Sequence, residues 1–212
     1  MEKNLQHEKW SSEFGEEYTK RNDLSHEELD ELYIKNFGIS RTELNKEFLA
    51  DLSKEIKILE VGCNTGMQLY NLNKNFGFEN LFGFDVSRTG LKIAKNNLPE
   101  ANFFEASALD IPFKDDYFGL VFTSGVLIHI HPENLPKVID EIYRTSRKYI
   151  WCYEYFSEEC KEIEYRGNKN LLWKNDFMKL FLERHPDLKV LKERKIKYKD
   201  SDNMDQMFLL EK

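Results

Sequence analysis

The sequence predicts a Rossmann-like α/β fold: a seven-stranded, mostly parallel sheet with an antiparallel terminal hairpin, preceded by an N-terminal helical extension. After residue 55, short apolar runs alternate with helical segments, which is typical of a parallel sheet covered by helices. The last two runs, Lys189 to Tyr198 and Met204 to Leu210, are joined by a short polar turn, as antiparallel neighbours are. We therefore expect a helical extension, or lid, over residues 1–54 and the α/β domain over residues 55–212.

Each strand of the sheet is predicted from its own composition. The run Ile56 to Val61 is short, mostly apolar and rich in β-branched residues, and it ends in a glycine loop, which favours a buried parallel strand. Four more strands are expected at 81–84, 102–105, 120–123 and 149–155. Helices are expected between the strands at 65–76, 87–97, 135–143 and about 174–182. The third of these has an apolar stripe at helical spacing, and Pro136 is tolerated in its first turn.

Three helices are predicted in the extension. Trp10, Phe14 and Tyr18 recur every four residues, which places them on one side of a single helix. Ser25 and the acid three residues later form a capping box that opens the second helix. Ser40 opens the third helix, whose apolar residues are expected to point inward.

Charge and composition restrict the partners and the compartment. The chain has 31 basic and 38 acidic residues, and a net charge of −7 repels phosphate backbones, so we expect no nucleic-acid partner. No apolar run approaches the roughly 20 residues that span a bilayer, and the polar N-terminus resembles no secretory signal. Three cysteines without paired or metal-ligand spacing indicate reduced thiols in the cytoplasm and no metal site. A monomer and a dimer are both compatible with this composition.

A glycine loop follows the first strand and precedes the first helix of the domain. In the segment Glu60-Val61-Gly62-Cys63-Asn64-Thr65-Gly66, Gly62 allows a sharp turn and Gly66 allows close approach of a ligand. Asn64 stands where glycine is common, and asparagine tolerates positive φ. Asp85 ends the next strand about 20 residues later, where an acid can accept hydrogen bonds from ribose hydroxyls. An ordinary strand-to-helix turn is the alternative, but the loop and Asp85 together favour a nucleoside site.

The kind of nucleoside follows from the charge beside the loop. The spacing Gly-x-x-x-Gly preceded by Glu60 differs from the usual dinucleotide motif, and a carboxylate disfavours a pyrophosphate at this place. The same carboxylate suits a ligand that carries an ammonium and a sulfonium, which indicates S-adenosylmethionine. Two alternatives stay open: a protein that binds this cofactor without turnover, and a nucleotide-dependent oxidoreductase on a related sheet.

These residues resemble the motifs of class I S-adenosylmethionine-dependent methyltransferases. The segment 60–66 resembles the first motif of the family and 85–87 the second. The segments 108–113 and 116–121 look like its third-strand loop and fourth strand, and 124–129 looks like the segment after that strand. The resemblance runs from about Ile56 to Tyr155.

A narrower resemblance covers nearly the whole chain. Trp10 with the segment 14–22, the segment 126–130, and the segments 165–167 and 172–174 are similar to the methylases associated with pseudaminic acid biosynthesis. This resemblance implies a small polar acceptor, such as a sugar, a sugar nucleotide or an intermediate of a nonulosonic-acid pathway. Oxygen, nitrogen and carbon are all compatible with it as the methylated atom.

The resemblance to the methyltransferases implies a set of cofactor-binding residues. They are Glu60, Gly62, Cys63, Asn64, Gly66, Asp85, Val86, Ser107, Ala108, Leu109, Ser124 and Gly125. In this set Asp85 would bind the ribose and Val86 would pack on the adenine. Ser107 stands where the family often has an aspartate, and its hydroxyl can still accept one hydrogen bond.

Two residues of the extension are candidates for the same site. Tyr18, with the other aromatic residues of its helix, is expected to form a lid over the cofactor, although an apolar stripe more often packs into a core. Arg21 is expected to reach the methionine carboxylate of the cofactor.

Methyl transfer from a sulfonium is a direct displacement, so alignment matters most and a base is needed only for an acceptor that loses a proton. His129 is the first candidate base, because it follows the fourth strand at the ligand-binding edge of the sheet; simple packing is its alternative. Glu154 lies near the end of the fifth strand and can orient the acceptor or take its proton, unless it is a solvated strand-end acid. Tyr165 and Arg166 are expected to bind the acceptor, with Arg166 on a carboxylate or phosphate; a surface ion pair is the alternative for Arg166.

Overall fold

The computed structural model describes residues 5–212. Two compact units make up the chain, one ending at Ser107 and the other running from Ala108 to Lys212. The boundary that the sequence predicts at 54/55 lies inside the first unit and stays a prediction.

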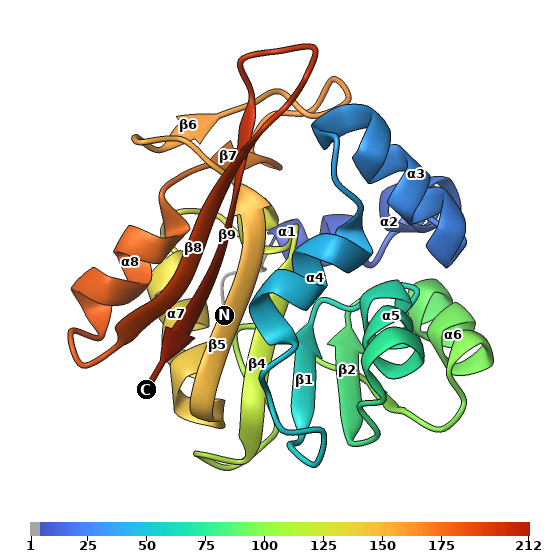
Figure 1. The fold of residues 1–212 in the computed structure, drawn as a ribbon. Helices are drawn as coiled ribbons and strands as arrows, with labels where there is room; N and C mark the ends of the chain where they lie inside the picture. Colours follow the sequence, from blue (N-terminus) through green and yellow to red (C-terminus); the bar gives the residue numbers. More distant parts are fainter. Residues whose placement is uncertain (1–4) are drawn as a thin grey trace. The chain divides into compact units, whose positions relative to one another are not determined.

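The first unit contains a helical segment and three parallel strands. Its first four helices are α1 (Leu5–Trp10), α2 (Glu13–Arg21), α3 (His26–Phe37) and α4 (Arg41–Leu49). They are followed by β1 (Ile58–Val61), α5 (Met67–Phe76), β2 (Leu81–Asp85), α6 (Arg88–Asn97) and β3 (Asn102–Glu105). Strand β2 pairs in parallel with both β1 and β3, and Figure 1 shows α5 and α6 beside these strands. The predicted strand at 102–105 is confirmed residue for residue.

The single aromatic helix predicted over Trp10, Phe14 and Tyr18 is wrong, because the chain breaks between α1 and α2. The hydroxyls of Ser11 and Ser12 donate to backbone carbonyls three residues earlier, and such side-chain bonds compete with helix hydrogen bonds. The rings still meet, since the Trp10 ring centroid lies 5.4 Å from that of Phe14 and 5.1 Å from that of Tyr18. The aromatic spacing therefore predicted the contact but not the break.

Both predicted helix starts in the extension are confirmed. The Ser25 hydroxyl accepts the amide hydrogen of Glu28, and Ser40 accepts that of Glu43, with each glutamate returning a bond to the serine amide. The apolar residues of α4 point inward as expected: Leu44, Phe48 and Leu49 are fully buried.

The second unit contains the rest of the sheet. Its elements are β4 (Phe118–Ser124), the short 3-10 helix η1 (Leu127–His129), α7 (Leu135–Thr145), β5 (Ser146–Tyr155), β6 (Lys161–Glu162), β7 (Trp173–Lys174), α8 (Phe177–Arg184), β8 (Lys189–Lys197) and β9 (Met204–Glu211). Strand β4 is parallel to β5, whereas β9 is antiparallel to both β5 and β8. Figure 1 shows β8 and β9 as a long hairpin beside β5.

The small hairpin formed by β6 and β7 was not predicted. It contains Lys174, so the helix expected from about that residue begins only at Phe177, where the Asp176 carboxylate caps it by accepting the Lys179 amide hydrogen. Two-residue strands have too few residues for a period-two pattern, which explains why they could not be predicted from the sequence.

The sheet order is β3-β2-β1-β4-β5-β9-β8, which confirms the predicted Rossmann-like sheet with an antiparallel terminal hairpin. The central strands are the most buried: every residue of β1 is buried, as are all but the last residue of β4. Among residues 5–212, no helix has both the length and the apolar character needed to cross a membrane.

Candidate functional site

The glycine loop after β1 turns through left-handed backbone conformations. Gly62, Asn64 and Gly66 have φ values of 70°, 43° and 72°, which confirms that Asn64 adopts positive φ. A Cβ at Gly66 would lie 3.0 Å from both Ala94 and Phe103, so this position needs glycine for space as well as conformation. The loop therefore brings its backbone close to α6 and β3.

Asp85 at the end of β2 holds this loop. One carboxylate oxygen accepts the Asn64 amide hydrogen at 2.8 Å, and the other accepts that of Ser87 at 2.8 Å. Burial raises the pKa of Asp85, and these amide donors act against the rise. Because each carboxylate oxygen has two lone pairs, the predicted bonds from ribose hydroxyls are compatible with this arrangement.

Glu60, which precedes the loop, is a buried acid. Its side chain is 3% exposed, and among the residues that the structure describes its Oε2 has no hydrogen-bond partner. Burial raises the pKa of Glu60 well above its usual range, the positive charge of Arg41 lowers it, and the negative charge of Asp85 raises it further. A buried acceptor without a donor is a place for a ligand N–H.

The side chains of three other predicted cofactor residues of the first unit, Cys63, Val86 and Ser107, differ in burial. The Cys63 side chain is buried and packs toward β2, since its sulfur lies 2.9 Å from where a Cβ at Gly83 would be. Val86 and Ser107 are half-buried, so part of each side chain is accessible to a ligand.

Helix α2 lies next to the segment that follows Asp85. The contact is made by Thr19 and not by Arg21, the residue predicted to reach the cofactor. Arg21 is exposed and lies 3.7 Å from Glu17, whereas Tyr18 is half-buried against Trp10. The residue that joins α2 to the site is Thr19, which is fully buried with its hydroxyl 3.4 Å from that of Ser87. Nothing in the sequence distinguished Thr19 from an ordinary helical threonine.

In the second unit, Glu154 organises the segment after β4. Its side chain is completely buried, and its oxygens accept the amide hydrogens of Val126 at 3.1 Å and Ile128 at 3.3 Å. Burial raises the pKa of Glu154 to about 7, although these bonds work in the opposite direction. The alternative of a solvated strand-end acid is therefore wrong, and the contacts favour a residue that positions the η1 turn.

His129 ends that turn with a defined tautomer. Its Nδ1 lies 2.7 Å from the Leu171 carbonyl oxygen, and because a carbonyl only accepts, Nδ1 carries the hydrogen. Burial lowers the pKa of His129 to about 4, so the ring is neutral at pH 7 with its lone pair on Nε2. The Tyr165 ring centroid lies 5.5 Å from that of His129, so these two predicted residues are neighbours.

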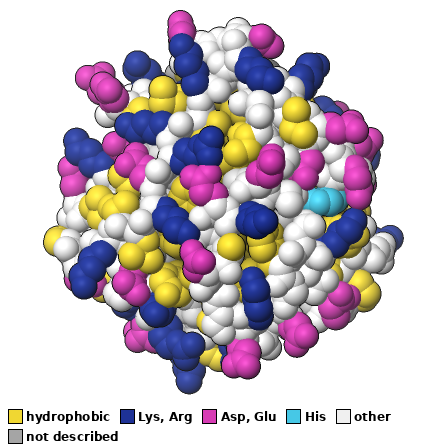
Figure 2. Space-filling model, in the orientation of Figure 1, with side chains coloured by type: hydrophobic (Ala, Val, Ile, Leu, Met, Phe, Trp, Pro, Cys, Tyr) yellow, Lys and Arg dark blue, Asp and Glu magenta, His cyan; other side chains and the backbone are white. Residues whose placement is uncertain are grey.

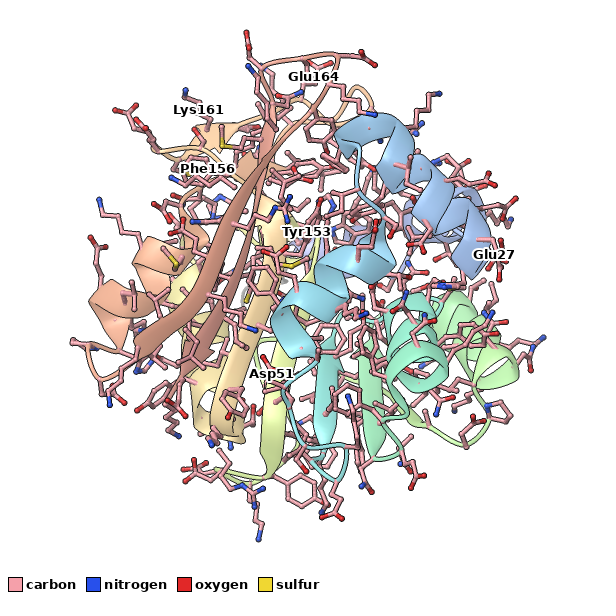
Figure 3. All side chains as sticks on the ribbon, in the orientation of Figure 1. Glu27, Asp51, Tyr153, Phe156, Lys161 and Glu164 are labelled. Atoms are coloured by element: carbon pink, nitrogen blue, oxygen red, sulfur yellow. The ribbon has the colours of Figure 1, made fainter. Side chains whose placement is uncertain are left out.

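The segment from β6 to β7 packs on the same turn. His131 meets the Trp173 ring with centroids 5.2 Å apart, and His129 binds Leu171 as described. Lys161 and Glu164, which Figure 3 labels, lie on the first arm of this hairpin and are exposed. The hairpin therefore borders η1 on one side and solvent on the other.

Arg166 is at the tip of a tight turn in this segment. Arg166 and Gly167 have φ values of 51° and 74°, and Tyr165 and Asn168 exchange two backbone hydrogen bonds of 2.8 and 3.0 Å, which define a type I′ turn. The Arg166 side chain is exposed, as a residue that binds an incoming acceptor would be.

Two of the remaining predicted residues of the second unit, Ser124 and Gly125, lie at the end of β4. Ser124 ends β4 opposite Tyr153 of β5, and Gly125, with φ of 67°, donates its amide hydrogen to the Tyr153 carbonyl at 2.8 Å. Ala108 and Leu109 are half-buried at the start of the unit. Each unit thus groups its own candidates: Glu60, the loop and Asp85 in the first, and His129, Glu154 and Tyr165 in the second.

Solved structures share this fold, which is that of Rossmann-like methyltransferases. The [4+2]-cyclase SpnF matches with a TM-score of 0.66 at 16% identity over 90% of this chain and 83% of its own. The geranyl diphosphate C-methyltransferase of Streptomyces coelicolor, solved with Mg²⁺, geranyl diphosphate and S-adenosyl-L-homocysteine, matches with a TM-score of 0.65 at 11% identity over 81% of this chain and 76% of its own. At these identities the likeness concerns the fold alone.

Comparison of the sequence, unlike that of the fold, identifies a domain family for part of the chain. Residues 58–148 match the family model described as a methyltransferase domain. An uncharacterised methyltransferase of Synechocystis is 32% identical over 91 residues, which are 43% of this chain and 42% of that protein. The chain spans only 40%, 42% and 38% of the first curated relatives it matches.

Proposed function

We propose that this chain is a methyltransferase that uses S-adenosylmethionine to methylate a small polar acceptor. The observation that carries the proposal is the left-handed glycine loop clamped by Asp85 beside the buried Glu60. The ammonium group of S-adenosylmethionine is a donor that suits the Glu60 oxygen without a partner. A pyrophosphate would instead add negative charge beside two carboxylates, which counts against a nicotinamide dinucleotide.

S-adenosylmethionine supplies an electrophilic methyl group on its sulfonium. The residues of the chain bind and orient the molecules: Glu60 takes the ammonium, Asp85 the ribose hydroxyls, and Val86 packs on the adenine. Ser107, Ala108, Leu109, Ser124 and Gly125 belong to the same proposed cofactor set. Alignment of the reacting atoms then lowers the barrier without further covalent chemistry.

His129 is the proposed base for an acceptor that carries a hydroxyl. Its neutral ring holds a proton on Nδ1 against the Leu171 carbonyl, so Nε2 is the atom that can take the acceptor proton. Glu154 is the proposed positioning residue of the same turn, through its bonds to Val126 and Ile128.

The acceptor is proposed to be a sugar, a sugar nucleotide or an intermediate of a nonulosonic-acid pathway. This proposal rests on the resemblance to the methylases of pseudaminic acid biosynthesis, together with Tyr165 beside His129 and the exposed Arg166. Arginine can bind a carboxylate or phosphate of such a molecule through two parallel hydrogen bonds. Figure 2 shows basic and acidic side chains intermixed on the face it draws, which favours a small acceptor over a nucleic acid.

Calorimetry with S-adenosylhomocysteine and assays of radiolabelled methyl transfer to a panel of sugars and nucleotide sugars test the proposal. We expect binding by the wild type and its loss in Gly62→Arg, which fills the loop. Binding without transfer to any acceptor would identify a cofactor-binding protein without turnover. A spectral change with a nicotinamide cofactor, and no binding of S-adenosylhomocysteine, would indicate an oxidoreductase.

A further inference from the structure

Glu141 and Arg144, one turn apart on α7, are joined by two hydrogen bonds between their charged groups. The Arg144 Nε donates to the Glu141 Oε1 at 3.1 Å, and its Nη2 donates to the Glu141 Oε2 at 2.8 Å. Glu141 is only 5% exposed, and the bonds from Arg144 lower its pKa to about 2 although burial acts against them. The pair is therefore charged at pH 7, and its bonds are of the strong, charge-assisted kind.

This ion pair holds both backbone polar groups of Ile111, in the segment that precedes β4. The Glu141 Oε2 accepts the Ile111 amide hydrogen at 2.8 Å, and the Arg144 Nη2 donates to the Ile111 carbonyl oxygen at 3.0 Å. Through Nη1, Arg144 also donates to the Phe113 carbonyl oxygen at 2.7 Å and to the Asp115 carboxylate at 2.8 Å. Side chains of α7 therefore satisfy backbone groups that a strand would pair with a neighbouring strand.

The hydrophobic core contributes little to the position of the segment 108–117. Of these residues, all of which the structure describes, only Ile111 is buried, and the others are half-buried or exposed. A segment with few buried apolar contacts opens locally at a low cost in free energy unless hydrogen bonds oppose the opening. Ala108 and Leu109, which are proposed to border the adenine, lie just before Ile111. Their position therefore depends on where the ion pair holds Ile111.

We propose that Glu141 and Arg144 are positioning residues of the cofactor site, which fix the backbone that carries Ala108 and Leu109 and thereby set the affinity for the adenine end of S-adenosylmethionine. The inference rests on the proposed function and deepens it on the adenine side. Both side chains act through Ile111 and need no contact with the cofactor. An ion pair that only stabilised α7 would have no such preference for one end of the cofactor.

Three ligands separate this role from a general effect on stability. S-adenosylhomocysteine carries both ends of the cofactor, 5′-methylthioadenosine lacks the amino-acid end, and S-ribosylhomocysteine lacks the adenine. In calorimetric titrations we expect Arg144→Met to weaken the first two ligands by a similar factor of about 10, the order of one charged hydrogen bond. The affinity for S-ribosylhomocysteine should not change.

Two further variants accompany this one. Arg144→Lys keeps the charge but not the planar fork that bonds two carbonyl oxygens, so it should show the same pattern with smaller losses, also if Arg144→Met folds poorly. Arg184→Met is the matched control, because it removes an ion pair of the same kind on the same helix, that with Asp140. It should leave all three affinities unchanged.

Hydrogen exchange of the Ile111 amide is the second measurement. In the free protein we expect at least about tenfold faster exchange in Arg144→Met than in the wild type, because the segment opens more easily. Saturation with S-adenosylhomocysteine should restore much of the lost protection, since the ligand then orders the segment. Exchange that stays fast in the complex would assign the ion pair to the fold alone.

The outcomes distinguish this inference from the proposed function. A wild type that binds S-adenosylhomocysteine, with losses in Arg144→Met that are equal for all three ligands or absent, would overturn the role of the ion pair and leave the function standing. Losses of the same size in Arg184→Met would also overturn it. A wild type that binds neither S-adenosylhomocysteine nor 5′-methylthioadenosine would contradict the proposed function itself.

Discussion

The carboxylate of Asp85 accepts the amide hydrogen of Asn64 at 2.8 Å, so the acid that ends β2 is bonded to the loop that follows β1. The same carboxylate accepts the Ser87 amide hydrogen at the start of α6. One side chain therefore shapes both segments that are proposed to hold the nucleoside. Its loss should affect folding and cofactor binding together.

Asp85→Asn should show this double effect. The amide NH₂ of asparagine would face one of the two backbone donors, so we expect a loss of about 1–3 kcal/mol of stability and at least a tenfold weaker binding of S-adenosylhomocysteine. Chemical denaturation and calorimetry measure the two effects. Glu105, which pairs with Asp85 in the register of β2 and β3, is the matched control, because its partner Arg88 is exposed. Similar losses in Glu105→Gln would contradict the role of Asp85.

Glu154 should make the stability of the protein depend on pH. Its pKa is about 7 in the folded state against 4.5 for an ordinary glutamate, so the folded state holds this proton longer than the unfolded chain. The sign follows: the stabilisation is fully present below about pH 4.5 and is lost as the pH rises through about 7, by roughly 3 kcal/mol. In Glu154→Gln this position cannot titrate. Denaturation at about pH 5 and about pH 8 should therefore show that the variant gains stability relative to the wild type as the pH rises. A constant difference would exclude the raised pKa.

The sequence predicted the sheet well because its signals are local. Short, mostly apolar runs predicted buried strands such as β1, and serine caps predicted the starts of α3 and α4. The glycine loop and Asp85 were found for the same reason, since turn chemistry and a strand end are visible in a few residues.

The missed features depend on contacts between distant parts of the chain. Arg41 looked like an ordinary residue in a first helical turn, and only the fold shows that it is fully buried and bonded to Asn45 and Tyr33. Glu154 was a candidate site residue, but its bonds to the turn after β4 were not predicted, because its amide partners lie 28 and 26 residues earlier. Thr19 likewise gains its contact with Ser87 only in the fold.

His129 should not titrate near neutral pH. Because its pKa is about 4, the imidazole signals of His129 in an NMR titration should stay constant from about pH 8 down to about pH 5. The signals of an ordinary histidine change within this range, with a midpoint near 6.5. His129→Gln identifies the signals by their absence. Since the folded pKa is lowered, the histidine also costs stability as the pH falls from about 6.5 through about 4. A midpoint near 6.5 would mean that the ring is exposed to solvent and not fixed by Leu171.

Gly15 should be essential for the packing of α1 on α2. A Cβ at this position would lie 1.8 Å from the Trp10 carbonyl oxygen, and because that atom belongs to the backbone, the two helices would have to separate. We expect Gly15→Ala to expose the Trp10 ring, which now meets Phe14 and Tyr18, and to make the chain more sensitive to proteolysis before residue 21. Limited proteolysis and a red shift of tryptophan fluorescence measure this. Ser11→Ala, which removes only one hydroxyl bond at the same helix break, is the control and should behave nearly as the wild type.

The same variant tests the lid prediction for Tyr18. If that prediction is right, Gly15→Ala should also weaken the binding of S-adenosylhomocysteine. An unchanged affinity in a variant with separated helices would exclude α1 and α2 from the cofactor site.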